Sequence, residues 1–258
     1  MEVVSAHDTV AAAAFTALAA NAGNSLFVRN FPDSAQAFIW DMWAQQASAG
    51  QIRLHSPRMH DDVQGLIFNV LAATTRGFFP TAARQKVYPN DQLRFEHTNG
   101  GVVEVDVGAF LVYYTDLPGV AARLSMWDQI YPNIVNLVTV DTVVAAGAVG
   151  DWSAGTVITT TSDLLKADTD YAILGYHSSV ASTCVGIQSA DTGNLRVGGP
   201  GVIEALETRD WFVRLAHDIG GPAIPVFNSN NKGSVLISIC NPAGAASNVT
   251  LFLAQLAR

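Results

Sequence analysis

The sequence is poor in charge. Asp, Glu, Lys and Arg make up 14% of its 258 residues, and 49% of the residues are hydrophobic, whereas soluble domains usually carry about 25% charged residues. Monomers rarely expose large apolar patches, so a surface with so few charges has to be covered by other subunits or by a membrane. We therefore expect much of the surface to be buried against neighbours.

Basic residues are especially few. The chain has 14 Lys and Arg against 22 Asp and Glu, which gives a formal net charge of -8. The basic residues are scattered, without a run that could neutralise a row of phosphates. Direct binding of nucleic acid is therefore not expected.

The chain also lacks a long hydrophobic run near its start. The apolar stretch Val10 to Ala20 is mostly alanine and has no Lys or Arg before it. It is far shorter than the roughly 20 residues that span a bilayer. We expect neither a signal peptide nor a transmembrane helix.

Cysteine is scarce as well. Cys184 and Cys240 are too few for a disulfide framework and are wrongly spaced for a zinc knuckle. Free cysteines behave as small buried residues, and we expect both to lie in strands. A disulfide between neighbouring strands stays open.

One N-terminal helix and many short strands are predicted. Ser5 can cap a helix that ends near Asn21, with apolar residues recurring on one face from Val10 to Ala19. After it, short strands alternate with Pro, Gly, Asn and Asp clusters, a pattern typical of an all-β sandwich or barrel. Residues 38–43 can be read as strand or helix. The other expected strands are 26–31, 37–44, 51–55, 66–71, 92–97, 102–114, 139–145, 156–161, 171–177, 183–188, 194–197, 211–215, 224–227, 234–240 and 248–256.

The two halves of the chain match each other. At an offset of 133, Phe38 and Trp40 fall on Tyr171 and Ile173, and the closing strands 111–117 and 250–256 match at an offset of 139. A loop insertion accounts for the drift between the two offsets. The fold class expected is all-β, with two tandem jelly-roll-like β-sandwiches. The expected parts are an N-terminal helix or arm (1–24), a first sandwich (25–118), a linker with helical character (119–138) and a second sandwich (139–258).

Motifs that could carry chemistry are weak. The loop His55 to Asp62 offers His55, His60, Asp61 and Asp62 to a metal, but it lacks the His-x-His of a cupin, and Arg58 can pair with its aspartates. His217 and Asp218 lack a nucleophile elbow. In the loop Asn228 to Asn231 only neutral oxygens are available to calcium. We predict no catalytic, cofactor-binding or metal-binding residue, no cofactor, and no enzyme activity.

Two further sequence features are interpreted as structural rather than functional. The run 191–201 contains Gly193, Gly198, Gly199 and Gly201, which we expect to adopt positive φ in a tight connection. The tryptophans are expected to be core or interface anchors. A sugar-binding platform is the alternative for this set, which is Trp40, Trp43, Trp127, Trp152 and Trp211.

Two sandwiches in one chain, low charge and no active site together resemble the double jelly-roll major capsid proteins of icosahedral phages and viruses. The resemblance covers about Leu26 to Leu256. It implies a structural virion protein that forms homotrimers within a shell, assembles in the host cytoplasm and contacts other virion proteins. An internal lipid membrane near the N-terminal helix is a further partner that it suggests. A tandem-sandwich carbohydrate-binding protein is the alternative, and a bicupin-like metal enzyme is the third.

Overall fold

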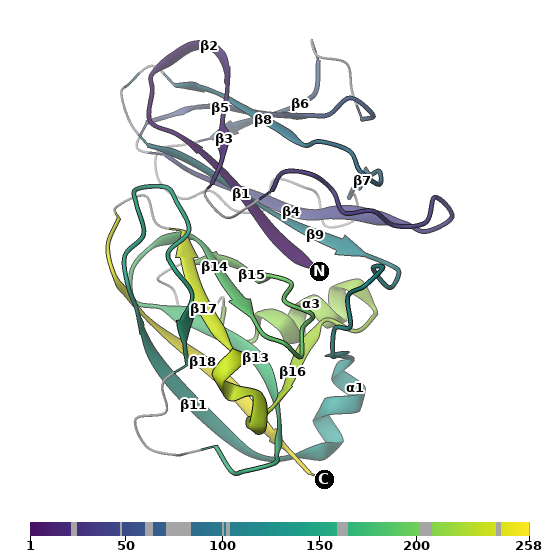
Figure 1. The fold of residues 1–258 in the computed structure, drawn as a ribbon. Helices are drawn as coiled ribbons and strands as arrows, with labels where there is room; N and C mark the ends of the chain where they lie inside the picture. The colour runs from purple at the N-terminus through teal and green to yellow at the C-terminus, as the bar shows by residue number, and fades with distance from the viewer. Residues whose placement is uncertain are drawn as a thin grey trace. The chain divides into compact units, whose positions relative to one another are not determined.

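The computed structural model describes residues 1–21, 25–46, 48–59, 64–70, 84–99, 101, 104–158, 165–201, 208–240 and 244–257. Most of these residues lie in antiparallel strands, which confirms the all-β fold class (Figure 1). Contacts divide the chain into two compact units. Unit 1 consists of residues 1–119, 147–152 and 240–244, and unit 2 of residues 120–146, 153–239 and 245–258.

Unit 1 is built from two sheets. One has the strand order β3-β1-β9-β4-β7 and the other β2-β8-β5-β6. Alternate or complete burial along the strands places their apolar side chains in one core, and all nine residues of β9 are buried. The strands are β1 (Glu2–Asp8), β2 (Ala12–Ala17), β3 (Ala19–Ala20), β4 (Ala37–Gln46), β5 (Gly50–His55), β6 (Leu66–Val70), β7 (Gln85–Val87), β8 (Arg94–Asn99) and β9 (Val105–Tyr113).

Unit 2 repeats this arrangement. Its sheets have the orders β10-β16-β13-β18-β11 and β12-β17-β14-β15. The strands are β10 (Leu124–Ser125), β11 (Ile134–Val144), β12 (Thr156–Val157), β13 (Asp170–Ser178), β14 (Ser182–Gln188), β15 (Val197–Gly201), β16 (Ile224–Asn228), β17 (Leu236–Cys240) and β18 (Ser247–Leu256). Taken in chain order, β11 to β18 occupy the places of β1, β2, β4, β5, β6, β7, β8 and β9. Eight strands in two sheets of this order form a jelly roll, so the described chain contains the same jelly roll twice.

A shared β-bulge fixes the register of the repeat. In unit 1, Trp40 is the extra residue between two rungs that β4 makes with β9. In unit 2, Leu174 is the extra residue between the equivalent rungs of β13 and β18. The offset is therefore 134 at these strands, and Leu111 matches Leu253 at an offset of 142. The predicted offsets of 133 and 139 paired the right strands in the wrong register. No residue of β13 is exposed, so its side chains do not alternate clearly between a buried and an exposed face, and the pattern gives little information on register.

The predicted N-terminal helix is wrong. The residues from Ser5 to Ala20 lie in or between β1, β2 and β3. β1 pairs with β9 from Glu2↔Leu111 to Asp8↔Val105. Tertiary pairing on both sides of β1 outweighs the modest helix preference of an alanine-rich segment, and alanine fits either period. The segment Phe38 to Trp43, for which strand and helix were both open, is part of strand β4.

Helices occur elsewhere in the described chain. The linker has the predicted helical character over α1 (Trp127–Ile130) and a 3-10 turn at Tyr131–Asn133, after which β11 begins. Residues 211–215 were predicted as a strand but belong to helix α3 (Trp211–Ile219). Its buried residues Phe212, Leu215 and Ala216 follow helical spacing, and a run of five residues is too short to distinguish the two periods.

The glycine-rich run serves a different purpose from the one expected. Gly193 has a positive φ of 62°, whereas Gly198, Gly199 and Gly201 are buried in strand β15. A Cβ at Gly198 would lie 1.9 Å from the backbone oxygen of Val185, and one at Gly199 would lie 2.6 Å from the ring of Trp211. These glycines permit close approach of neighbouring elements rather than an unusual φ.

Gly198→Ala should therefore destabilise the protein. The added methyl group meets backbone that cannot move aside, and overpacking of this kind costs about 1–3 kcal/mol. Gly233→Ala is the matched control, because an added Cβ there meets nothing within 4 Å, and it should change the free energy of unfolding by less than about 0.5 kcal/mol. Denaturant unfolding of both variants measures the difference, and equal stabilities would contradict the packing described for β15.

Candidate functional site

Of the four residues that could act as ligands in the loop His55 to Asp62, the structure describes only His55. His55 is buried at the end of β5, with Nε2 3.4 Å from Oε2 of Glu96. His60, Asp61 and Asp62 lie outside the described residues, so neither the metal loop nor the pairing of Arg58 with these aspartates is tested. The guanidinium of Arg58 lies over the ring of Tyr88 and donates to the carbonyl of Pro89.

The loop Asn228 to Asn231 is held by hydrogen bonds. The Nδ2 of Asn228 donates to Asp170, and the Nδ2 of Asn231 donates to both carboxylate oxygens of Asp191. Asp170 also binds Arg123, whose guanidinium lowers the pKa of that carboxyl group below its usual range. The nearby acidic groups therefore already accept hydrogen bonds from this loop and from Arg123.

The remaining candidates have packing roles. The ring of His217, in the last turn of α3, lies 6.4 Å from the ring of Trp127. Trp152 is buried, and the Nε1 of Trp211 donates to the carbonyl of Gly198. Cys184 and Cys240 are both buried and free, so they do not form a disulfide.

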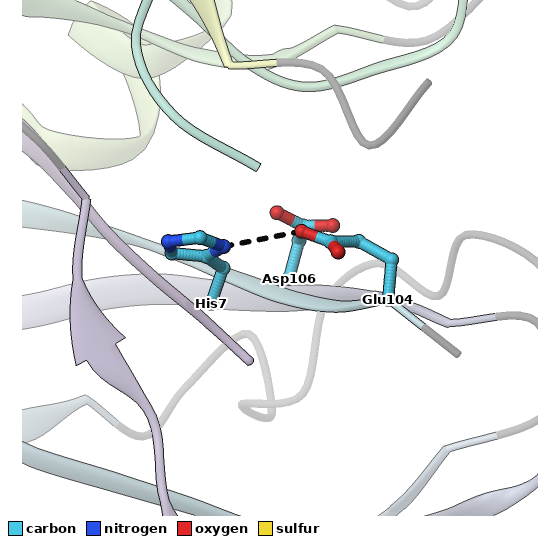
Figure 2. Close-up of side chains that lie close together, drawn as sticks. All are labelled: His7, Glu104 and Asp106. Carbon is cyan, nitrogen blue, oxygen red and sulfur yellow. Dashed lines mark hydrogen bonds and ion pairs between the residues drawn. The ribbon is translucent and has the colours of Figure 1, made fainter. Parts of the chain in front are cut away.

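A polar cluster at one end of the β1–β9 pair was missed from the sequence. It consists of His7, Glu104 and Asp106, whose potential ligand atoms all lie within 4.8 Å of one another. Figure 2 shows the three side chains converging. Nδ1 of His7 lies 3.2 Å from Oε1 of Glu104, and its Nε2 lies 3.6 Å from Oδ1 of Asp151. All four residues belong to unit 1.

The strand register explains why these side chains meet. His7 on β1 lies directly opposite Asp106 on β9, and paired residues of antiparallel strands point to the same face. Glu104 stands two positions before Asp106 and so follows the same alternation. The Glu-x-Asp spacing was visible in the predicted strand 102–114, but His7 had been placed in a helix and could not be set against it.

Asp106 is the unusual member of the cluster. It is fully buried, and neither carboxylate oxygen has a hydrogen-bond partner among the described residues. Burial raises the pKa of Asp106 well above its usual range, and the negative charges of Glu104 and Asp151 raise it further. Burial also raises the pKa of Glu104, although its hydrogen bond to His7 opposes that shift.

The loop around Gly150 closes over this cluster. A Cβ on Gly150 would lie 2.1 Å from Oε1 of Glu104 and 2.2 Å from Nδ1 of His7. The Sγ of Cys240 donates to the carbonyl of Gly150, and the Nδ2 of Asn21 donates to that same sulfur. Burial raises the pKa of the Cys240 thiol, with a smaller contribution from the charge of Asp106. The thiol is therefore a neutral support for the loop. Chemically, the cluster can hold a proton or a cation between its carboxylates.

Asp106→Asn should stabilise the metal-free protein at neutral pH. The folded state binds the proton of Asp106 more tightly than the unfolded state, so stability falls as the pH rises from the ordinary value of 3.8 through the raised folded pKa. The amide removes that loss and can donate to the neighbouring acceptors, a gain of about 1–3 kcal/mol. Unfolding in EDTA should show this gain at pH 7 and little of it near pH 4.

Asp116→Asn serves as the control, because Asp116 is an exposed carboxylate of the same unit. It should leave stability nearly unchanged at both pH values. A loss of stability in Asp106→Asn at pH 7 would contradict the burial of an uncompensated carboxylate.

Comparisons with known proteins add little to this picture. No model of a known protein family matches the sequence, and no curated protein sequence matches it. Among solved structures, the PBSX exported protein XepA aligns over 97% of this chain and 85% of its own, at 11% identity and a TM-score of 0.27. The STIV major capsid protein aligns over 97% and 96%, at 8% identity and a TM-score of 0.22. Both likenesses are weak.

Proposed function

We propose that this chain is a structural virion protein, the major subunit of an icosahedral shell, and that it works by self-association rather than by turnover. The observation that carries the proposal is the character of strand β11. Its support comes from a comparison between the two jelly rolls of the same chain, together with the low charge of the whole sequence. Jelly rolls also occur in lectins and cupins, so the fold by itself does not choose among these classes.

Strand β11 is an edge strand with exposed apolar side chains. It pairs with β18 along one side and ends its sheet in the described chain. Val135, Leu137 and Val143 on this strand are 57%, 66% and 68% exposed. A long, exposed, apolar edge strand is a template for association with another chain, and monomeric proteins normally protect such edges.

The equivalent strand of unit 1 is protected. β1 has five buried residues out of seven. On the side away from β9, it pairs with β3 through Ala6↔Ala20 and His7↔Ala19. Two copies of one fold thus differ at the same place. β3 covers the outer edge of β1, whereas no described strand pairs with the outer edge of β11. The difference supports β11 as a surface that a second copy of this chain covers.

The low charge extends this argument to the whole surface. With 14% charged residues, the chain has few charged side chains with which to keep a monomer soluble. A homotrimer within a closed shell would cover both the edge of β11 and further apolar surface, and closed assembly removes the hazard of open-ended association. Assembly in the host cytoplasm with other virion proteins belongs to the same proposal.

The membrane contact suggested for an N-terminal helix loses its basis, because those residues form strands. No helix in the described part of the chain is long and apolar enough to cross a membrane.

Leu137→Lys should prevent assembly without unfolding the protein. A lysine on an edge strand adds charge where a neighbour would pack, yet it stays in solvent in the isolated chain. Sedimentation and negative-stain microscopy of the parent protein should show trimers or shells. The variant should sediment as a monomer, with an unchanged circular-dichroism spectrum.

Val10→Lys is the matched control. Val10 is 57% exposed, but it lies outside β11, in unit 1. This variant should assemble like the parent protein. A parent protein that remains monomeric at high concentration would overturn the proposed function, and assembly by Leu137→Lys would overturn the role of β11.

A further inference from the structure

We propose that His7, Glu104 and Asp106 bind one divalent metal ion of the Zn²⁺ or Mn²⁺ type within unit 1. The three groups offer one imidazole nitrogen and two carboxylates, and they come from strand β1 and from the start of strand β9. The site goes beyond the proposed function, since shell assembly does not require it.

The first argument is a missing positive charge. Glu104, Asp106 and Asp151 bring three carboxylates to one place, and both charged groups that act on Asp106 are acidic. His7 is the basic partner that Glu104 has in this cluster. Buried charges in proteins are paired or coordinate metals. A bound cation would compensate Asp106, for which the described side chains offer no hydrogen-bond donor.

The second argument is the unused ligand at the centre. Asp106 is fully buried, and its two oxygens have no hydrogen-bond donor among the described residues. It nevertheless points toward His7 and Glu104 (Figure 2). A carboxylate held in this way has both oxygens free to coordinate an ion, whereas an ordinary structural aspartate would already accept hydrogen bonds.

The third argument is that neighbouring groups are placed to orient the ring of His7. A metal-bound histidine usually directs its second ring nitrogen to a carboxylate, which fixes its orientation. The ring of His7 has Glu104 near Nδ1 and Asp151 near Nε2. The backbone of Gly150 lies where a side chain would collide with both His7 and Glu104. The lack of a side chain at Gly150 therefore lets the loop approach both groups closely.

The donor set selects the kind of ion. Calcium takes six to eight oxygens, and magnesium usually keeps several waters, while imidazole favours zinc and similar ions and carboxylates suit manganese. Tetrahedral ligands at about 2.1 Å from zinc lie roughly 3.4 Å apart. Ligand atoms within 4.8 Å of one another reach that spacing through small rotations of the carboxylates. The ion would pin β1 to the start of β9.

The experiment measures metal content and metal affinity on the full chain. After dialysis against EDTA, the protein is titrated separately with Zn²⁺, Mn²⁺, Mg²⁺ and Ca²⁺ in a calorimeter, and thermal unfolding is followed with each ion. We expect one equivalent of Zn²⁺ or Mn²⁺ to bind, and at about 100 times Kd the Tm should rise by about 5 °C or more. Mg²⁺ and Ca²⁺ should bind at least about tenfold more weakly.

Asp106→Asn and His7→Gln test the ligands. Each should weaken binding by about 100-fold or more, because even the loss of a second-shell partner costs about 10- to 100-fold. Asp116→Asn should bind like the parent protein. Asp106→Asn should also remain folded in EDTA, so that lost binding cannot be explained by unfolding.

Two results would overturn the site: no binding of Zn²⁺ or Mn²⁺ by the parent protein at millimolar concentration, or unchanged affinity in Asp106→Asn. Binding of Ca²⁺ or Mg²⁺ as tight as that of Zn²⁺ and Mn²⁺ would overturn the choice of ion. Leu137→Lys, the assembly variant, should bind metal normally. Failure of the metal site and failure of the proposed assembly are therefore separate outcomes.

Discussion

Each jelly roll depends on one antiparallel strand that is paired on both sides. In unit 1 this strand is β9, which lies between β1 and β4 and is buried along its whole length. In unit 2 it is β18, between β11 and β13. These strands are the last of their units, so neither sheet can close until the end of its sequence has joined the beginning. Pairing over such separations fixes which residues of distant segments face one another.

The same pairing creates the polar cluster of unit 1. Because β1 meets β9 in one register, His7 lies opposite Asp106. Unit 2 follows the same strand order, yet its strand β11 carries exposed apolar residues where β1 is covered. The same strand order thus carries a buried acidic cluster in unit 1 and an uncovered edge strand in unit 2. Strand order tolerates such differences because it depends on the apolar face of each strand and not on the remaining side chains.

Local patterns predicted the strands well where one period dominated. The predicted strands 171–177 and 183–188 lie within β13 and β14, and the turn-rich spacing indicated a sandwich correctly. Errors arose where the local signal fitted two structures. Alanine between Val10 and Ala20 permits helix or strand, and the aromatic and branched residues after Trp211 suit either period. The repeat was recognised one residue out of register at β13, because no residue of this strand is exposed and its burial pattern gives little information on register.

The sequence by itself determined that the chain is rich in short strands, duplicated and poor in charge, because composition and alternation are local properties. Only the tertiary structure decided that the first 20 residues contain the strands β1, β2 and β3 and no helix, that β11 is an uncovered edge while β1 is covered, and that His7 meets Glu104 and Asp106. His7 and Glu104 are separated by 97 positions, and no local pattern relates them. Their meeting depends on which strands pair and in what register, and that choice is made by the burial of the whole sandwich.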